Sequence, residues 1–181
     1  MVAIDLSLRS TGLVALDNEW NYKDCLLVSA TLKDESLLEF NSQKICDFIN
    51  KNQEVLNIAI EGLSFMSVSG SKDVLYGNFW HLRCKIYENT YYQNKFDIVP
   101  VTRWRSGIFK VETQRRWKLE CKKNPLKEMV VNNLPEDVKI KLMDYIKENK
   151  FKVPQIYDLA DAYWLARYTY YQLNNIQYEK I

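Results

Sequence analysis

Histidine is nearly absent from this chain of 181 residues, which contains only His81. Ser-His-Asp triads and histidine-rich metal centres are therefore almost excluded, and we expect His81 to be a surface histidine or a helix histidine with satisfied hydrogen bonds. The four cysteines form no C-x-x-C pair, so neither a zinc framework nor a disulfide framework is indicated. No apolar run approaches the roughly 18 residues of a membrane span. These absences indicate a protein with reduced thiols, not associated with a membrane.

The composition that remains is globular, with 47% hydrophobic and 27% charged residues. The length suits a single domain, residues 1–181. A strand is predicted from residue 2, which leaves no room for a signal peptide. We therefore expect a cytoplasmic protein, from a bacterial cytosol or a virus-infected host cell.

Charge is distributed unevenly along the chain. Residues 1–60 carry five Lys/Arg against nine Asp/Glu, whereas residues 103–127 carry nine Lys/Arg against two Asp/Glu. An acidic half followed by a basic segment indicates a polyanionic partner that is bound at one place.

Hydrophobic periodicity predicts an α/β fold, with the element order β-β-β-α-β-α-β, a basic insert at about 102–152, and a last helix. The insert is expected to be irregular or in short helices. Right-handed crossovers place the first strand beside the fourth, at the centre of a mixed five-stranded sheet flanked by helices. The predicted strands are Val2–Leu8, Leu13–Asp17, Cys25–Leu32, Leu56–Glu61 and Phe96–Val101, and the helices Ser36–Asn52, about Lys72–Gln93, Pro135–Asn149 and Tyr157–Gln172.

Two of these strands carry an acid after an Ala-Ile pair, in VAIDLSL (Val2 to Leu8) and IAIEGLS (Ile58 to Ser64). An unpaired carboxylate in a buried strand costs several kcal/mol. Asp158 and Asp161 follow at i and i+3 of the last helix, where such a pair alone could be a solvated helix N-terminus. The residues after them are nearly all apolar, however, so this helix is mostly buried. Divalent ions would relieve the repulsion among the four acids, and oxygen ligands alone select Mg²⁺ or Mn²⁺.

Three segments stand out in chain order: Asp5, Arg9, Thr11 and Gly12 (D-x-x-x-R-x-T-G), Ile60-Glu61, and Asp158-Leu-Ala-Asp161-Ala162 (D-x-x-D-A). In this order, the motifs resemble those of the RuvC-type Holliday junction resolvases, within the RNase H-like superfamily. The resemblance implies an Mg²⁺-dependent crossover junction endodeoxyribonuclease that resolves four-way DNA junctions by paired symmetric nicks. It also implies that Asp5 bridges two metal ions, which Mn²⁺ can replace, with Glu61, Asp158 and Asp161 completing the ligands.

This sequence departs from the family pattern at two points. Ser7 and Ser64 stand where the family often has a glycine and an aromatic residue, and Phe65 follows one position later. Phe65 is therefore either a wedge at a junction or a residue of ordinary loop packing. The stretch between the fifth strand and the last helix is also longer than in bacterial members.

Cations and aromatics alternate through Val101–Lys127. Cations bind phosphates without regard to sequence, and aromatics can stack on unpaired bases. The alternative is a solvated face with Trp104 and Trp117 as core anchors. We expect DNA contacts from Arg9, Arg103, Arg105, Lys110, Arg115, Arg116, Lys118, Lys122 and Lys123.

Three other functions are alternatives to the resolvase. The same fold could serve an RNase H-like nuclease for flaps, other branched DNA or RNA–DNA hybrids. A sugar-kinase-like ATPase shares a hairpin similar to Asp5–Gly12, but needs a second domain and glycine motifs that five glycines cannot supply. A non-catalytic DNA-binding module would not need all four acids.

A four-way junction has two-fold symmetry and requires two cuts, which predicts a C2 homodimer. The long helix at about Lys72–Gln93 is the expected interface, because its aromatics exceed what its core-facing stripe needs. The aromatics in question are Tyr76, Trp80, Tyr87 and Tyr91.

Overall fold

A computed structural model of the protein describes residues 1–7, 10–29, 36–52, 57–63, 72–90 and 96–181. Its five strands form one mixed sheet in the order β3-β2-β1-β4-β5. The first three strands are antiparallel, and β4 runs parallel to both β1 and β5. This confirms the predicted sheet, with β1 and β4 adjacent at its centre. The strands are β1 (Val2–Asp5), β2 (Thr11–Leu16), β3 (Tyr22–Val28), β4 (Ile58–Gly62) and β5 (Phe96–Pro100).

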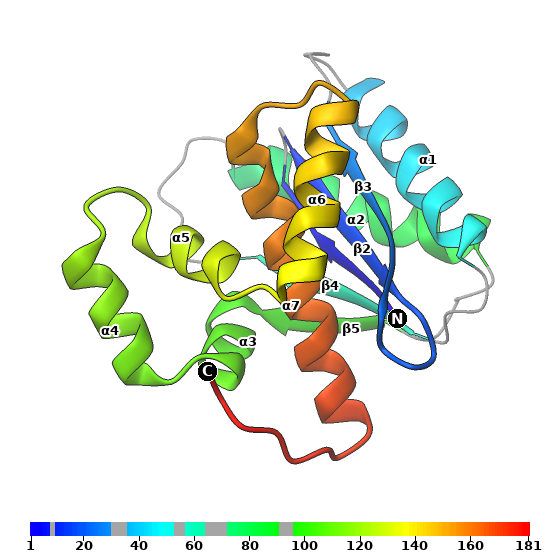
Figure 1. The fold of residues 1–181 in the computed structure, drawn as a ribbon. Helices are drawn as coiled ribbons and strands as arrows, with labels where there is room; N and C mark the ends of the chain where they lie inside the picture. Colours follow the sequence, from blue (N-terminus) through cyan, green and yellow to red (C-terminus); the bar gives the residue numbers. More distant parts are fainter. Residues whose placement is uncertain (8–9, 30–35, 53–56, 64–71, 91–95) are drawn as a thin grey trace.

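Helices cover both faces of the sheet (Figure 1). One face is covered by α1 (Ser36–Lys51) and α2 (Lys72–Asn89). The other is covered by α7 (Ile156–Leu173), around which α3 (Val101–Ile108), α5 (Pro125–Asn132) and α6 (Glu136–Glu148) pack. The fourth helix, α4 (Val111–Glu120), projects from the body, and a short 3-10 turn, η1 (Val153–Gln155), precedes α7. No described helix combines the length and hydrophobicity that crossing a bilayer would need.

Strand alternation decides which side chains face which helices. Val2 and Ile4 of β1 lie in the core beneath α1 and α2. Ala3, between them, lies in the core beneath α7, and so does Ala59 of β4. Since side chains two apart on a strand share a face, Asp5 and Glu61 belong to the α7 face.

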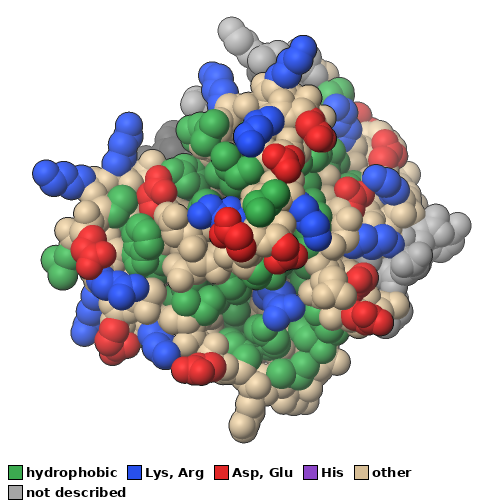
Figure 2. All heavy atoms as spheres, viewed as in Figure 1, with side chains coloured by type: hydrophobic (Ala, Val, Ile, Leu, Met, Phe, Trp, Pro, Cys, Tyr) green, Lys and Arg blue, Asp and Glu red, His purple; other side chains and the backbone are tan. Residues whose placement is uncertain are grey.

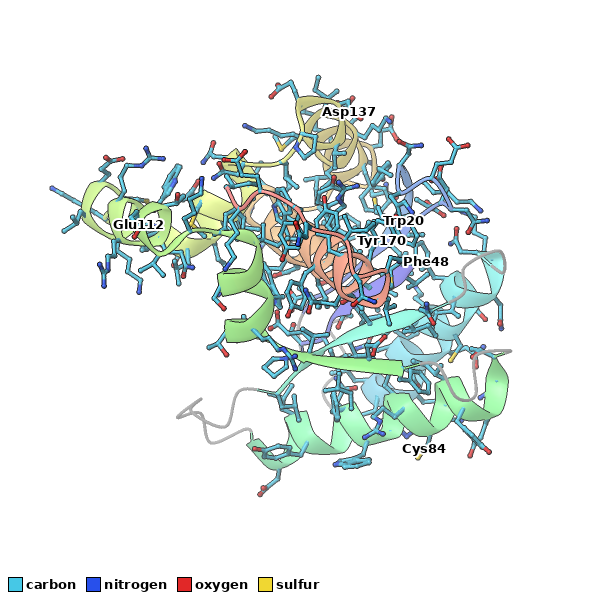
Figure 3. The ribbon with its side chains drawn as sticks, turned by 90° about the horizontal axis from the view of Figure 1, so that it is seen from below. Trp20, Phe48, Cys84, Glu112, Asp137 and Tyr170 are labelled. Atoms are coloured by element: carbon cyan, nitrogen blue, oxygen red, sulfur yellow. The ribbon has the colours of Figure 1, made fainter. Side chains whose placement is uncertain are left out.

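The segment expected to be irregular or in short helices is built of four helices, α3 to α6. Three of them are held by buried apolar residues, including Trp104, Met129 and Leu142, that pack into the core beneath α7. In contrast, α4 has no buried residue. Figure 3 shows Glu112, on α4, far out from the sheet. The basic insert is thus part of the core except for one protruding helix.

The third strand begins at Tyr22, three residues before its predicted start at Cys25. The Asp17 carboxylate accepts hydrogen bonds from the backbone N–H groups of Glu19 and Asn21, at 2.8 and 2.9 Å. These bonds close a tight turn, so pairing with β2 resumes at once. The predicted end of the strand, at Leu32, lies outside the described residues.

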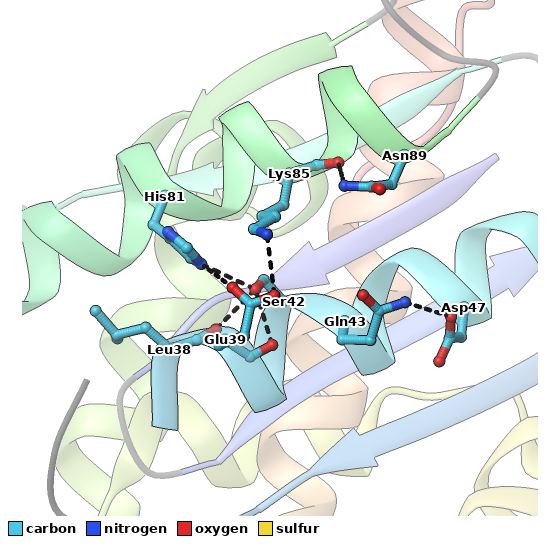
Figure 4. A network of polar contacts seen from close by, with 8 residues as sticks. All are labelled: Leu38, Glu39, Ser42, Gln43, Asp47, His81, Lys85 and Asn89. Atoms are coloured by element: carbon cyan, nitrogen blue, oxygen red, sulfur yellow. Dashed lines mark hydrogen bonds and ion pairs between the residues drawn. The ribbon is translucent and has the colours of Figure 1, made fainter. Parts of the chain in front are cut away.

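A polar network joins α1 to α2 (Figure 4). The Glu39 carboxylate accepts a hydrogen bond from Lys85 Nζ at 2.9 Å and lies 3.2 Å from His81 Nε2. His81 Nε2 also lies 3.1 Å from Ser42 Oγ. The single histidine therefore sits in a contact between two helices, as expected from the sequence.

Gly12 of β2 is where α7 comes closest to the sheet. A Cβ placed on Gly12 would lie 2.2 Å from the backbone oxygen of Asp158. We expect Gly12→Ala to destabilise the fold by about 1–3 kcal/mol, because neither backbone can move freely. Gly77→Ala in α2 is the matched control: its Cβ meets nothing within 4 Å. It should stabilise by roughly 0.5–1 kcal/mol. Urea denaturation measures both, and an unaffected Gly12→Ala would contradict the close approach.

Candidate active site

The site lies where β1 and β4 end side by side. Their parallel register pairs Ile4 with Ile60. The next residues, Asp5 and Glu61, therefore lie at the same end of two neighbouring strands, on the same face. This is the arrangement that the repeated Ala-Ile-acid pattern predicts.

The other two acids come from α7, which lies across this face. Gly12 pairs with Asp5 across β1 and β2, and the backbone of Asp158 lies against Gly12. The lack of a side chain at Gly12 thus lets the first turns of α7 approach the strand acids. Asp158 keeps 14% of its side-chain surface exposed, whereas Asp161 keeps 4%. The structure therefore brings together the four acids that the sequence singles out.

The turn that follows β1 is fixed by its own hydroxyls. Ser7 Oγ donates to the carbonyl of Ser10 at 2.8 Å, and Thr11 Oγ1 donates to the carbonyl of Ser7 at 2.9 Å. A further hydrogen bond joins Ser10 to Asp158; burial raises the pKa of that carboxyl, and this bond offsets part of the rise. The Ser and Thr residues after Asp5 therefore connect the first strand to the first turn of α7.

Burial raises the pKa of all four carboxyls above their usual values. For Asp5, the charges of Glu61, Asp161 and Asp158 raise the pKa further. For Glu61, burial and then the charge of Asp161 raise the pKa to about 7. These carboxyls are close enough for each charge to oppose its neighbours.

Three donors offset this negative charge. Arg105 Nη2 of α3 lies 2.9 Å from Asp161 Oδ2, and Arg105 keeps only 18% of its side-chain surface exposed. Lys127 Nζ of α5 lies 3.4 Å from Asp158 Oδ1. Trp104 Nε1, also of α3, donates to Glu61 Oε2 at 2.8 Å. Each of these three acids thus has its own partner.

The oxygen chemistry of the four acids suits a hard divalent ion, and one of their oxygens lacks a protein partner. Within the described part of the chain, Asp161 Oδ1 is buried and has no hydrogen-bond donor. The donor set is made only of carboxylate oxygens, which suits Mg²⁺ or Mn²⁺. Across the described ranges, no three His, Cys, Asp or Glu side chains are already grouped to hold an ion. In this conformation, Arg105 and Lys127 supply the positive charge.

The cations expected to bind DNA fall into two groups. All but two are exposed on α3, on α4 or in the turns beside it, namely Arg103, Lys110, Arg115, Arg116, Lys118, Lys122 and Lys123. In Figure 2, Lys and Arg side chains gather on the left edge, over α4, with acidic side chains between them. Arg105 differs, because it lies in the acidic site. Arg9 and Phe65 lie outside the described residues.

Sequence reasoning missed all three partners of the acids. Arg105 is predicted only as a DNA contact, yet it pairs with Asp161. Lys127 stands at the end of the basic stretch, and nothing local separates it from its neighbours. Trp104 is predicted only as a core anchor or a stacking residue. It is fully buried, yet its indole N–H also reaches Glu61. Trp117 packs partly buried against the core.

The raised pKa of Glu61 predicts a pH-dependent stability of the metal-free protein. Its folded value, about 7, lies above the usual 4.5, so the folded chain holds this proton more tightly than the unfolded chain does. The resulting stabilisation is full below pH 4.5 and is lost as the pH rises through about 7. Melting temperatures of the wild type and Glu61→Gln, measured with chelator from pH 4.5 to 8.5, compare the protein with and without this carboxyl. As the pH rises, the melting temperature of the wild type should fall relative to that of the variant. Parallel curves of melting temperature against pH would contradict the raised pKa of Glu61.

No family model matches the sequence, and no curated protein matches it. The fold, in contrast, matches those of solved structures. Thermus thermophilus RuvC matches with a TM-score of 0.57 and 12% identity, over 97% of each chain. T. thermophilus RuvC in complex with a Holliday junction substrate matches with a TM-score of 0.57 and 12% identity, over 96% of each. The yeast mitochondrial Holliday junction resolvase Ydc2 matches with a TM-score of 0.48 and 14% identity, over 96% of this chain and 81% of that one. The chain therefore has the fold of RuvC, as its strand order and motifs predict.

Proposed function

We propose that this protein is a metal-dependent, structure-specific DNA endonuclease that resolves four-way junctions by paired symmetric nicks. The observation that carries the proposal is the convergence of Asp5, Glu61, Asp158 and Asp161 on one face of the sheet. Their fold is that of RuvC, which has been solved with a Holliday junction substrate. Flaps, other branched DNA and RNA–DNA hybrids are the alternative substrates.

Asp5, Glu61, Asp158 and Asp161 would hold two Mg²⁺ ions, or Mn²⁺ in their place. Bound ions supply activation of water and neutralisation of charge at the scissile phosphate. The chain itself excludes water from Asp161 and orients Glu61 through Trp104. Lys127 keeps 44% of its side-chain surface exposed beside Asp158. It is thus placed to contact a phosphate that enters the site.

The exposed cations of α4 and its following turn would bind the arms of the substrate. Arg115, Arg116, Lys122 and Lys123 are exposed, and α4 has no fully buried residue; only Trp117 packs partly buried against the core. Phosphate contacts of this kind give affinity without sequence preference. The protruding helix would therefore enlarge the DNA-binding surface beyond the acidic site.

A homodimer would present two such sites to a two-fold substrate. On the outer face of α2, Trp80 and Tyr87 are 58% and 53% exposed. Together with Arg83, Cys84, Glu88 and Phe96, they line a groove of about 290 Å³. Tyr76 is only partly exposed, and Tyr91 lies outside the described residues. Aromatic side chains left on one helix face are typical of an interface core.

Loss of single acids should abolish cleavage while leaving DNA binding nearly intact. We expect no cleavage by Asp5→Asn, Glu61→Gln or Asp161→Asn, with junction affinity within about tenfold of the wild type, because affinity comes mainly from phosphate contacts. Cleavage should require Mg²⁺ or Mn²⁺ and fail in Ca²⁺, whose coordination is looser. Cleavage and gel-shift assays on four-way junctions, flaps, linear duplex and RNA–DNA hybrids measure this. Near-normal cleavage by Asp5→Asn would refute the metal site.

Removing the exposed cations of α4 and its following turn should weaken DNA binding and its salt dependence. The variant changes Arg115, Arg116, Lys122 and Lys123 to Gln. The slope of log K against log salt concentration should become shallower, by up to about 0.9 for each phosphate that the variant no longer binds.

A control variant makes the same change of charge on another exposed surface. It changes Lys141, Lys147, Lys150 and Lys152, on α6 and after it, to Gln. We expect its salt slope to stay near that of the wild type. Equal effects of the two variants would mean that only total charge matters, and would locate the DNA groove elsewhere.

Sedimentation should reveal a species of twice the 21.5 kDa chain mass, at least with junction DNA bound. Trp80→Glu combined with Tyr87→Glu should shift the protein to monomers, since buried charge opposes the interface. Paired nicks should fall on opposing strands and leave 5′-phosphate ends that a ligase seals. A strict monomer that cuts linear duplex as well as a junction would leave a nuclease but not a resolvase.

A further inference from the structure

Two consecutive residues of α3 reach two different carboxylates. Trp104 donates to Glu61 of β4, and Arg105 pairs with Asp161 of α7. Consecutive helix positions point about 100° apart, so α3 has to lie in the angle between β4 and α7 for both bonds to form. It does pack against α7 and against β5, the neighbour of β4. The helix is thus fixed relative to both halves of the acidic site.

The bond from Trp104 restricts the Glu61 side chain. The indole ring is fully buried, so its N–H has one fixed direction. The N–H donates to Glu61 Oε2 at 2.8 Å and does not bond to Glu61 Oε1. A glutamate has three rotatable side-chain bonds, and a bond at one oxygen removes most of that freedom. Oε1 is left to serve as a ligand.

Trp164, a second buried tryptophan, offers a comparison, because its indole N–H bonds only to the protein backbone. Trp164 is 6% exposed, and its Nε1 donates to the backbone carbonyl of Val130 at 3.0 Å. Trp104 is buried too, at 0% exposed, but its acceptor is a carboxylate of the acidic site. A hydrogen bond to an ionised carboxylate is shorter and stronger than one to a neutral carbonyl.

We propose that Trp104 is a positioning residue that presents Glu61 to a divalent ion. This inference rests on the metal site of the proposed function, but not on the DNA substrate. Outer-shell partners of metal ligands typically alter metal affinity by about 10–100-fold when removed. The N–H of Trp104 acts on the ion only through Glu61, and that route is testable.

The test is a titration of the metal-free, full-length protein with Mn²⁺ in the absence of DNA. The EPR signal of free Mn²⁺ measures how much of the ion remains unbound. Trp104→Phe keeps an aromatic ring but removes the donor. It should weaken Mn²⁺ binding by about 10–100-fold. The matched control is Trp164→Phe, which removes a buried indole N–H from the same core and should leave Mn²⁺ affinity unchanged. Melting temperatures report whether each variant is folded.

The route through Glu61 is tested by a double variant. Glu61→Gln alone should weaken Mn²⁺ binding, and adding Trp104→Phe to it should cause no further loss. Should Trp104→Phe fail to fold, 3-benzothienylalanine at position 104 keeps the shape of the indole and lacks the N–H. The same loss of affinity is expected from it.

Three results would overturn the proposal: unchanged Mn²⁺ affinity in folded Trp104→Phe, an equal loss in Trp164→Phe, or a further loss on top of Glu61→Gln. A wild type that binds no Mn²⁺ would overturn the metal site as well. Normal Mn²⁺ results combined with no junction cleavage would refute the proposed substrate and leave the role of Trp104 standing.

Discussion

Repulsion among carboxylates at the end of two central strands is the constraint on which the rest of this structure depends. Asp5 and Glu61 lie side by side because β1 and β4 are parallel and in register. Asp158 and Asp161 join them because Gly12 lets α7 approach. Such a group is stable only when positive charge or donors accompany it. Arg105, Lys127 and Trp104 meet that need from helices far along the chain.

The two faces of the sheet differ in function: one only packs helices, and the other also holds the acidic site. Beneath α1 and α2 the core is apolar, and the polar contacts on that side, such as those of Glu39, join the two helices to each other. Beneath α7 the core is apolar too, but it ends in the acidic site. Helices α3, α5 and α6 complete that core, and the first two also carry the partners of the acids. Packing and site chemistry are therefore coupled on one face and separate on the other.

The acidic site and the basic helix α4 act on a nucleic acid in opposite directions. A nucleic acid is repelled by uncompensated carboxylates and attracted by the exposed cations of α4. Under the proposed function, divalent ions would reverse the local sign at the acids, so metal and DNA should favour each other's binding. Arg105 and Lys127 keep the metal-free site from being strongly negative. Their pairing with the acids also explains how the fold persists with the carboxyls so close.

The sequence by itself determined the strand order, the sheet and the position of Asp5 and Glu61 at the ends of neighbouring strands. These follow from periodicities of two and 3.6 residues, which are local, and from crossover handedness, which leaves few topologies. Only the tertiary structure decided which cation faces which acid. Arg103 and Arg105 look alike in sequence, yet one is exposed and the other pairs with Asp161. The direction of Trp104 and the approach of Lys127 depend on how α3 and α5 pack against α7, and that packing angle comes from contacts between residues distant in the chain.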